Sequence, residues 1–173
     1  SVRLGSGGTL ELTGTIDVGA AARFTAELEQ VGEYVKRVAL DSPGGSVNDA
    51  VKIGALIVVG EYTTVVAPGA LCASSCPLIL AGGRARLASR QSAIGVHQIY
   101  AMASAADLPS GLAGVGTAMS EAQRTTAIIT RYLNRTTADP TFWLHALETP
   151  PDQLYYLSAE ELSQYRLVTQ FTD

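Results

Sequence analysis

Three short segments of the chain hold the residue types that serine acyl-transfer chemistry requires. Gly44 and Gly45 form a glycine pair. Ser74 lies among small residues, and His97 follows an apolar stretch. The chemistry needs a nucleophilic hydroxyl, a base that takes its proton, and backbone donors for the oxyanion. Only two histidines, His97 and His145, are present, so few side chains could act as the base.

The glycine pair comes directly after a predicted buried strand over residues 38–40. Ser46 then caps a predicted helix. Amides at the start of a helix favour negative charge, and glycines leave them uncovered by side chains. The pair could therefore donate to an oxyanion, although an ordinary strand-to-helix turn would have the same sequence.

Ser74 begins a second predicted helix, over residues 74–81, on a tight turn. There its hydroxyl would be exposed, and the following amide of Ser75 could donate to the oxyanion. The alternative is that both serines only cap the helix. His97, near a strand end, could take the serine proton or could be a structural histidine. We interpret His145 as structural.

Two cysteines, Cys72 and Cys76, lie on either side of the candidate serine. On a helical turn, Cα atoms four residues apart are about 6 Å from each other, which a disulfide tolerates. Two buried free thiols are the alternative. With two cysteines, two histidines and no acidic residue beside them in sequence, a zinc site is not expected, and neither is a cofactor.

Composition narrows the class of protein. A chain of 173 residues with 47% hydrophobic content can bury a core, and we expect one domain spanning residues 1–173. The net charge is −4 and no basic run occurs, so neither nucleic acid nor anionic lipid is expected as a partner. No apolar stretch reaches the roughly 20 residues of a membrane span.

The hydrophobic pattern alternates between strand and helix periods, which predicts an α/β fold with largely parallel pairing. Residues 101–116 are rich in Ala, Ser and Gly without a period and predict a mobile loop. The expected strands are 9–13, 38–40, 63–67, 85–87, 93–96, 154–157 and 167–171, and the expected helices are 18–31, 46–59, 74–81, 119–133, a short one from Pro140 and a last one capped by Ser158.

The order and spacing of these segments resemble the proteolytic subunit of Clp protease and, more widely, the Clp-protease/crotonase superfamily. The interval from Gly45 to Ser74 matches that family without a gap, and Val96-His97-Gln98 matches its Ile-His-Gln. Further matches, which extend the resemblance over nearly the whole chain, are Leu12-Thr13-Gly14-Thr15-Ile16, Asp41-Ser42-Pro43-Gly44-Gly45, Leu157-Ser158-Ala159 with Glu160-Glu161, and Leu167-Val168.

The resemblance implies a fold and a function. The fold would be a Clp-protease/crotonase-like spiral of β-β-α units. The chain would be a serine hydrolase, as a peptidase acting on a peptide or protein, without a cofactor. Ser74 would be the nucleophile, His97 the base, and the amides of Gly45 and Ser75 the oxyanion hole. The helix over residues 119–133 would mediate contacts between copies, which predicts a homo-oligomer.

Two departures from the family pattern leave alternatives open. The family's catalytic aspartate falls on Leu154, which cannot orient an imidazole. Asp152 is the nearest aspartate and is our candidate for that role. Without it the protein would be a Ser–His dyad or a non-catalytic assembly or binding module of the same fold. Cys72 and Cys76 resemble periplasmic relatives, so we expect a periplasmic or exported protein, with a cytoplasmic one as the alternative.

Two further interpretations are weaker. A crotonase-type acyl-CoA enzyme would leave Ser74 and His97 without a role, and the chain is short for it. A Ser–Lys dyad would need Lys36 or Lys52, of which one precedes a strand and the other lies on the helix after the glycine pair.

Overall fold

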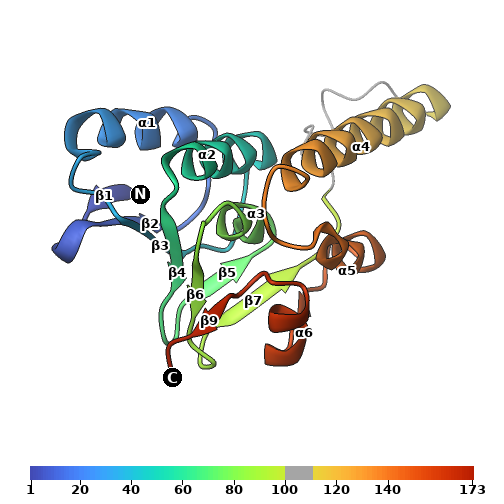
Figure 1. Ribbon diagram of the computed structural model, residues 1–173. Helices are drawn as coiled ribbons and strands as arrows, with labels where there is room; N and C mark the ends of the chain where they lie inside the picture. Colours follow the sequence, from blue (N-terminus) through green and yellow to red (C-terminus); the bar gives the residue numbers. More distant parts are fainter. Residues whose placement is uncertain (100–110) are drawn as a thin grey trace.

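The computed structural model describes residues 1–99 and 111–173, and in these it is a mixed α/β fold (Figure 1). The elements are β1 (Val2–Leu4), η1 (Ser6–Gly8), β2 (Thr9–Thr13), α1 (Ala20–Val31), β3 (Arg37–Asp41), α2 (Val47–Gly60), β4 (Thr63–Val66), β5 (Leu71–Ala73), α3 (Cys76–Ala81), β6 (Arg86–Ala88), β7 (Ala93–Val96), α4 (Leu112–Leu133), η2 (Pro140–Trp143), α5 (Leu144–Glu148), β8 (Tyr155–Tyr156), α6 (Ala159–Gln164) and β9 (Gln170–Phe171).

Two sheets organise these elements. Six strands form one sheet in the order β1-β2-β3-β4-β6-β9, and all its pairs are parallel except β1–β2. A second sheet has the order β5-β7-β8, in which β7 pairs in parallel with β5 and antiparallel with β8. Chain order therefore repeats strand, strand, helix in β4-β5-α3 and β6-β7-α4, as expected for a spiral of β-β-α units.

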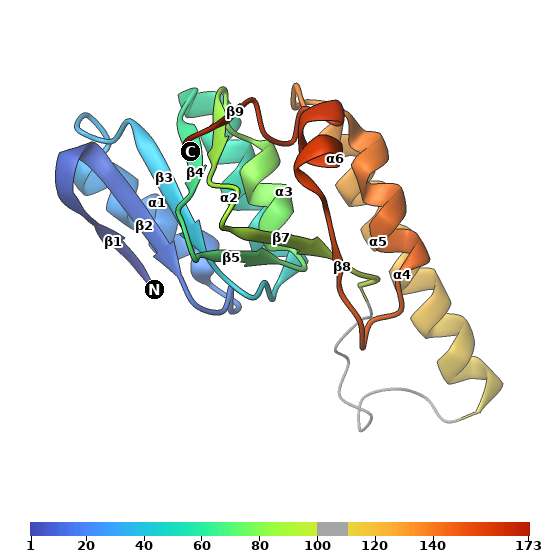
Figure 2. The same ribbon diagram turned by 90° about the horizontal axis from the view of Figure 1, so that it is seen from below.

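The second sheet brings the chemistry-bearing segments together. Register pairs Ala73 at the end of β5 with Gly95 in β7. Ser74 follows β5 directly, and His97 follows β7 directly. Parallel neighbouring strands have their carboxyl ends at the same edge of a sheet. The pairing therefore places the serine and the histidine at adjacent strand ends. Figure 2 shows β5 and β7 side by side beneath α3.

The C-terminal half of α4 is anchored to the core beside this sheet. Tyr132 is 3% exposed, and its hydroxyl donates a 2.6 Å hydrogen bond to the carbonyl of Leu78 on α3. Burial raises the pKa of Tyr132, so its hydroxyl stays a donor over the whole physiological range. The N-terminal half of α4 extends beyond the rest of the fold (Figure 1).

Most predicted elements occur in the structure, and the main differences are at the start of α4 and in two short strands. Residues 112–116, predicted as loop, form the first turns of α4, because Ala113 and Leu112 carry helix propensity that the two glycines do not cancel. The remainder of that predicted loop, residues 101–110, lies outside the described residues. The strands β1 and β5 were not predicted.

No helix among the described residues is both long enough and apolar enough to cross a membrane.

Candidate active site

Ser74 occupies the sharp turn between β5 and α3. Its φ is 61°, in the left-handed region that residues other than glycine rarely adopt. Its amide donates to the carbonyl of Gly95 at 2.9 Å, which continues the β5–β7 pairing one residue further. A strand-to-helix turn of this kind holds a serine hydroxyl away from the backbone, where a reacting group can approach it.

His97 lies within hydrogen-bond reach of that hydroxyl. Its Nε2 atom is 2.8 Å from Ser74 Oγ, and both residues are half-buried. On its other side, Nδ1 is 2.7 Å from the main-chain carbonyl oxygen of Pro151. A carbonyl can only accept, so Nδ1 carries the proton and Nε2 presents its lone pair to the Ser74 hydroxyl. That is the tautomer a general base for serine requires.

The structure does not bring the Asp152 carboxylate to the imidazole. Its side chain is exposed, and it makes no hydrogen bond to His97 in residues 1–99 and 111–173. Pro150-Pro151 does direct the chain to the imidazole, but it delivers the carbonyl of Pro151 rather than the next carboxylate. Leu154, at the family's aspartate position, is half-buried. The imidazole is therefore oriented by a neutral acceptor.

We accordingly predict that Asp152→Asn leaves turnover within about threefold of wild type. Replacing a carboxylate that holds the imidazole tautomer with an amide lowers kcat by about 10⁴-fold. An exposed surface charge, in contrast, acts on the site only through a long-range field that salt screens. Steady-state kinetics with an activated ester would measure the effect. A loss of two orders of magnitude would show that Asp152 reaches His97 during the reaction.

The glycine pair packs directly against the serine turn. A Cβ atom on Gly44 would lie 2.6 Å from the Ala73 carbonyl oxygen and 2.9 Å from the Ser75 amide nitrogen. A Cβ atom on Gly45 would lie 2.2 Å from the carbonyl oxygen of Ile16. Both glycines have positive φ, 95° and 144°. Only glycine permits so close an approach with this backbone.

Two amides at this junction have no acceptor among the residues that the structure describes. Within the described ranges, neither the Gly45 amide nor the Ser75 amide donates a hydrogen bond to another residue. The neighbouring amides are engaged: Gly44 donates to Ser42 Oγ at 3.0 Å, and Ser46 donates to the Ile16 carbonyl at 2.6 Å. Unengaged amides close to a nucleophile are what an oxyanion site provides.

Asp49, on the first turn of α2, supports the glycine turn and was not singled out by sequence. Its carboxylate accepts from the amides of Gly19 and Ala21 at 3.1 and 3.0 Å and from the Ser46 hydroxyl at 2.7 Å. Burial raises the pKa of Asp49, but the hydrogen bonds from Ala21, Ser46 and Gly19 lower it below its ordinary value. The Ser46-to-Asp49 spacing is a capping pattern that could have indicated this role.

The two cysteines form a disulfide, and both are fully buried. Among the described residues, no group of three or more His, Cys, Asp or Glu side chains lies close enough together to hold a metal ion.

His145 stacks on Tyr155 with ring centroids 4.3 Å apart, and its Nε2 is 2.9 Å from the Tyr165 hydroxyl. Both of these partners lie away from the Ser74 turn, as expected of a structural histidine.

The topology and the strand-end serine and histidine define a Clp-protease/crotonase-like fold. The sequence profile of the Clp protease family matches residues 8–173, so the chain belongs to that family. Among solved structures, a mutant of ClpP1 from Listeria monocytogenes is similar in fold, with a TM-score of 0.68 and 19% sequence identity over 96% of this chain and 91% of that one. No curated protein matches the sequence.

Proposed function

We propose that this chain is a serine hydrolase, and specifically a peptidase, that acts through Ser74 and His97. The observation that carries the proposal is the 2.8 Å contact between Ser74 Oγ and His97 Nε2, with Nδ1 held by the Pro151 carbonyl. Membership of the Clp protease family supports the same reaction class.

The proposed reaction uses these atoms in order. Ser74 Oγ attacks the acyl carbon while its proton passes to His97 Nε2, and the amides of Gly45 and Ser75 donate to the oxyanion. The intermediate collapses, and His97 returns the proton to the leaving amine. Water then attacks the acyl-serine with the same base, which releases the acid and restores the serine hydroxyl.

A neutral carbonyl sets the tautomer but stabilises the imidazolium less than a carboxylate does. This feature favours the second candidate, a non-catalytic binding module of the same fold. The two are separated by turnover of p-nitrophenyl acetate and fluorescein-labelled casein. A hydrolase gives turnover above that of a His97→Ala variant for at least the ester, and a binding module gives none for either substrate.

A pocket of about 230 Å³ beside His97 is our candidate for the substrate side chain. It lies between the residues after β7, the middle of α4 and the η2–α5 segment, and its walls are largely apolar or hydroxylated. Its lining residues are His97, Gln98, Ile99, Ala122, Thr125, Thr126, Ile129, Trp143, Ala146 and Leu147.

Filling this pocket should change selectivity. We expect Ala122→Leu to lower kcat/KM about tenfold or more for peptides with a large apolar residue before the scissile bond, because the added carbons occupy its volume. The hydrolysis of p-nitrophenyl acetate should change little, since an acetyl group leaves the pocket empty. Ala113→Leu, exposed on the same helix, is the matched control. Equal losses for both substrates would place the side-chain site elsewhere.

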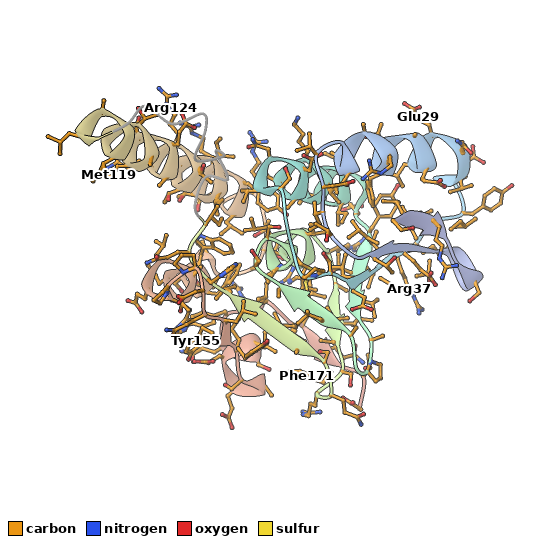
Figure 3. The ribbon with its side chains drawn as sticks, turned by 180° about the vertical axis from the view of Figure 1, so that it is seen from behind. Glu29, Arg37, Met119, Arg124, Tyr155 and Phe171 are labelled. Carbon is orange, nitrogen blue, oxygen red and sulfur yellow. A yellow bond between two sulfur atoms is a disulfide. The ribbon has the colours of Figure 1, made fainter. Side chains whose placement is uncertain are left out.

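We also propose that α4 mediates self-association, through a different part than expected. Within the expected helix over residues 119–133, Ile129 and Tyr132 are 1% and 3% exposed and pack on the chain's own core. The most exposed apolar residues of α4 are Leu112, Val115 and Met119, at 91%, 57% and 60% exposure, and they follow one stripe of the helix. Figure 3 labels Met119 on the part of α4 that extends from the body.

Met119→Glu should therefore shift the protein toward monomer by at least tenfold in dissociation constant, because a buried unpaired charge opposes association. Thr117→Glu places the same charge on the other side of the helix and should leave association unchanged. Sedimentation velocity at micromolar concentration would measure both. A wild-type protein that is monomeric there would refute the proposal.

We propose a periplasmic or otherwise exported location, supported by the Cys72–Cys76 disulfide, since disulfides persist in oxidising compartments. A chain recovered from cells as a free dithiol after rapid thiol blocking would favour the cytoplasm instead.

A further inference from the structure

The disulfide encloses the candidate nucleophile. Cys72 belongs to β5, Cys76 is the first residue of α3, and Ser74 is the middle residue of the loop that they close. The same loop contains the Ser75 amide, which has no acceptor among the described residues. Both sulfur-bearing side chains are 0% exposed, so the link lies beneath the turn and not on its surface.

The turn that the disulfide spans has an unusual conformation. Ser74 adopts a φ of 61°, which costs free energy in a residue with a Cβ atom. The Ser75 hydroxyl is buried yet has no hydrogen-bond partner within the described residues, so it does not cap the turn. The Ser74 amide donates to the Gly95 carbonyl at 2.9 Å and the Ser75 carbonyl accepts from the Leu78 amide at 3.1 Å, so these hydrogen bonds hold the two sides of the loop separately, and the disulfide links those sides covalently.

The loop is also too short for the disulfide to act mainly on the unfolded chain. The entropy that a crosslink removes from the unfolded state grows with the length of the closed loop, and here the sequence separation is four. A link of this span constrains local geometry more than global folding.

We propose that Cys72 and Cys76 are positioning residues for the reaction, because their disulfide holds Ser74 Oγ and the Ser75 amide in register with His97 and Gly45. This inference rests on the proposed function. Loss of the link lets the turn relax from its positive φ, which displaces nucleophile and oxyanion donor together. A displacement of about 1 Å at a reacting centre costs on the order of 10²-fold in rate.

The decisive comparison uses three forms of the full chain with p-nitrophenyl acetate: the oxidised wild type, the wild type unfolded and reduced by dithiothreitol and then refolded with its thiols free, and Cys72→Ala/Cys76→Ala. Reduction gives each cysteine sulfur one electron and one proton, and dithiothreitol leaves as its cyclic disulfide. We expect kcat to fall about 10- to 100-fold in both disulfide-free forms with KM within about threefold. Reoxidation should restore the wild type, and the double variant should not respond to dithiothreitol.

Two further measurements separate positioning from general destabilisation. Phe24→Leu, a change in the core on α1, lowers folding stability without touching the turn and should keep its kcat. Hydrogen exchange of the Ser74 amide should accelerate at least tenfold without the disulfide, whether or not the protein turns over substrate.

Unchanged kcat together with unchanged Ser74 exchange in the double variant would overturn the inference. An equal kcat loss in Phe24→Leu would reduce it to a stability effect and overturn it as well. If the oxidised wild type does not turn over the ester at all, the proposed function fails, and the exchange of the Ser74 amide alone decides whether the disulfide holds the turn.

Discussion

Ser74→Ala should lower kcat for p-nitrophenyl acetate by on the order of 10³-fold or more. The hydroxyl is the only side-chain oxygen placed against the unprotonated Nε2 of His97 among the described residues, and its removal leaves only binding and oxyanion effects. KM should change little, because alanine removes one atom that faces the base. The initial burst of p-nitrophenol, which reports the acyl-enzyme, should disappear completely.

Ser75→Ala is the matched control for this experiment. It removes the neighbouring hydroxyl, which is buried and has no hydrogen-bond partner within the described residues, but retains the amide assigned to the oxyanion. We expect kcat to remain within about threefold of wild type. If Ser75→Ala abolishes the burst while Ser74→Ala keeps it, the nucleophile is Ser75 and the alignment with the family is displaced by one residue.

Gly45→Ala should lower kcat by about 10²- to 10³-fold. Its new Cβ atom would lie 2.2 Å from the carbonyl oxygen of Ile16, a backbone atom that cannot rotate away, so the turn must move. The φ of 144° adds strain for any residue with a side chain. The amide then leaves the oxyanion position, and the loss of one such donor costs about this much.

Gly69→Ala is a suitable comparison, because Gly69 also has a positive φ, 75°, but an added Cβ atom meets nothing within 4 Å. The Gly69→Ala variant therefore has the conformational cost of a positive φ without a collision of the added Cβ atom. Circular dichroism should show both variants folded, with turnover lost only in Gly45→Ala. Wild-type kcat in a folded Gly45→Ala protein would remove the Gly45 amide from the mechanism.

The sequence singles out the parts of the candidate site that depend on residue type. Gly44–Gly45, Ser74 and His97 could be identified because glycine pairs, serines among small residues and scarce histidines are visible as letters. The Clp protease resemblance, now confirmed by the family profile, added their order. The partner of His97 Nδ1 could not be predicted, since a main-chain carbonyl is present at every residue and leaves no mark in the sequence.

The helix α4 was harder to predict for a related reason. Its first turns are rich in alanine and glycine, so local propensity is nearly balanced between helix and loop. The burial of Ile129 and Tyr132 depends on how α4 packs against α3. That packing is a tertiary contact between residues that are far apart in the sequence. Helical periodicity identifies an apolar face but not which part of the helix the core covers.

The most direct test of the central claim is to locate the adduct of a fluorophosphonate probe on the oxidised wild-type chain by mass spectrometry of its peptides. Such probes phosphonylate a serine only where a base and oxyanion donors activate it. The Ser74–His97 geometry predicts a single adduct on Ser74, lost in His97→Ala. An unlabelled wild-type protein, or an adduct on another serine, would contradict it.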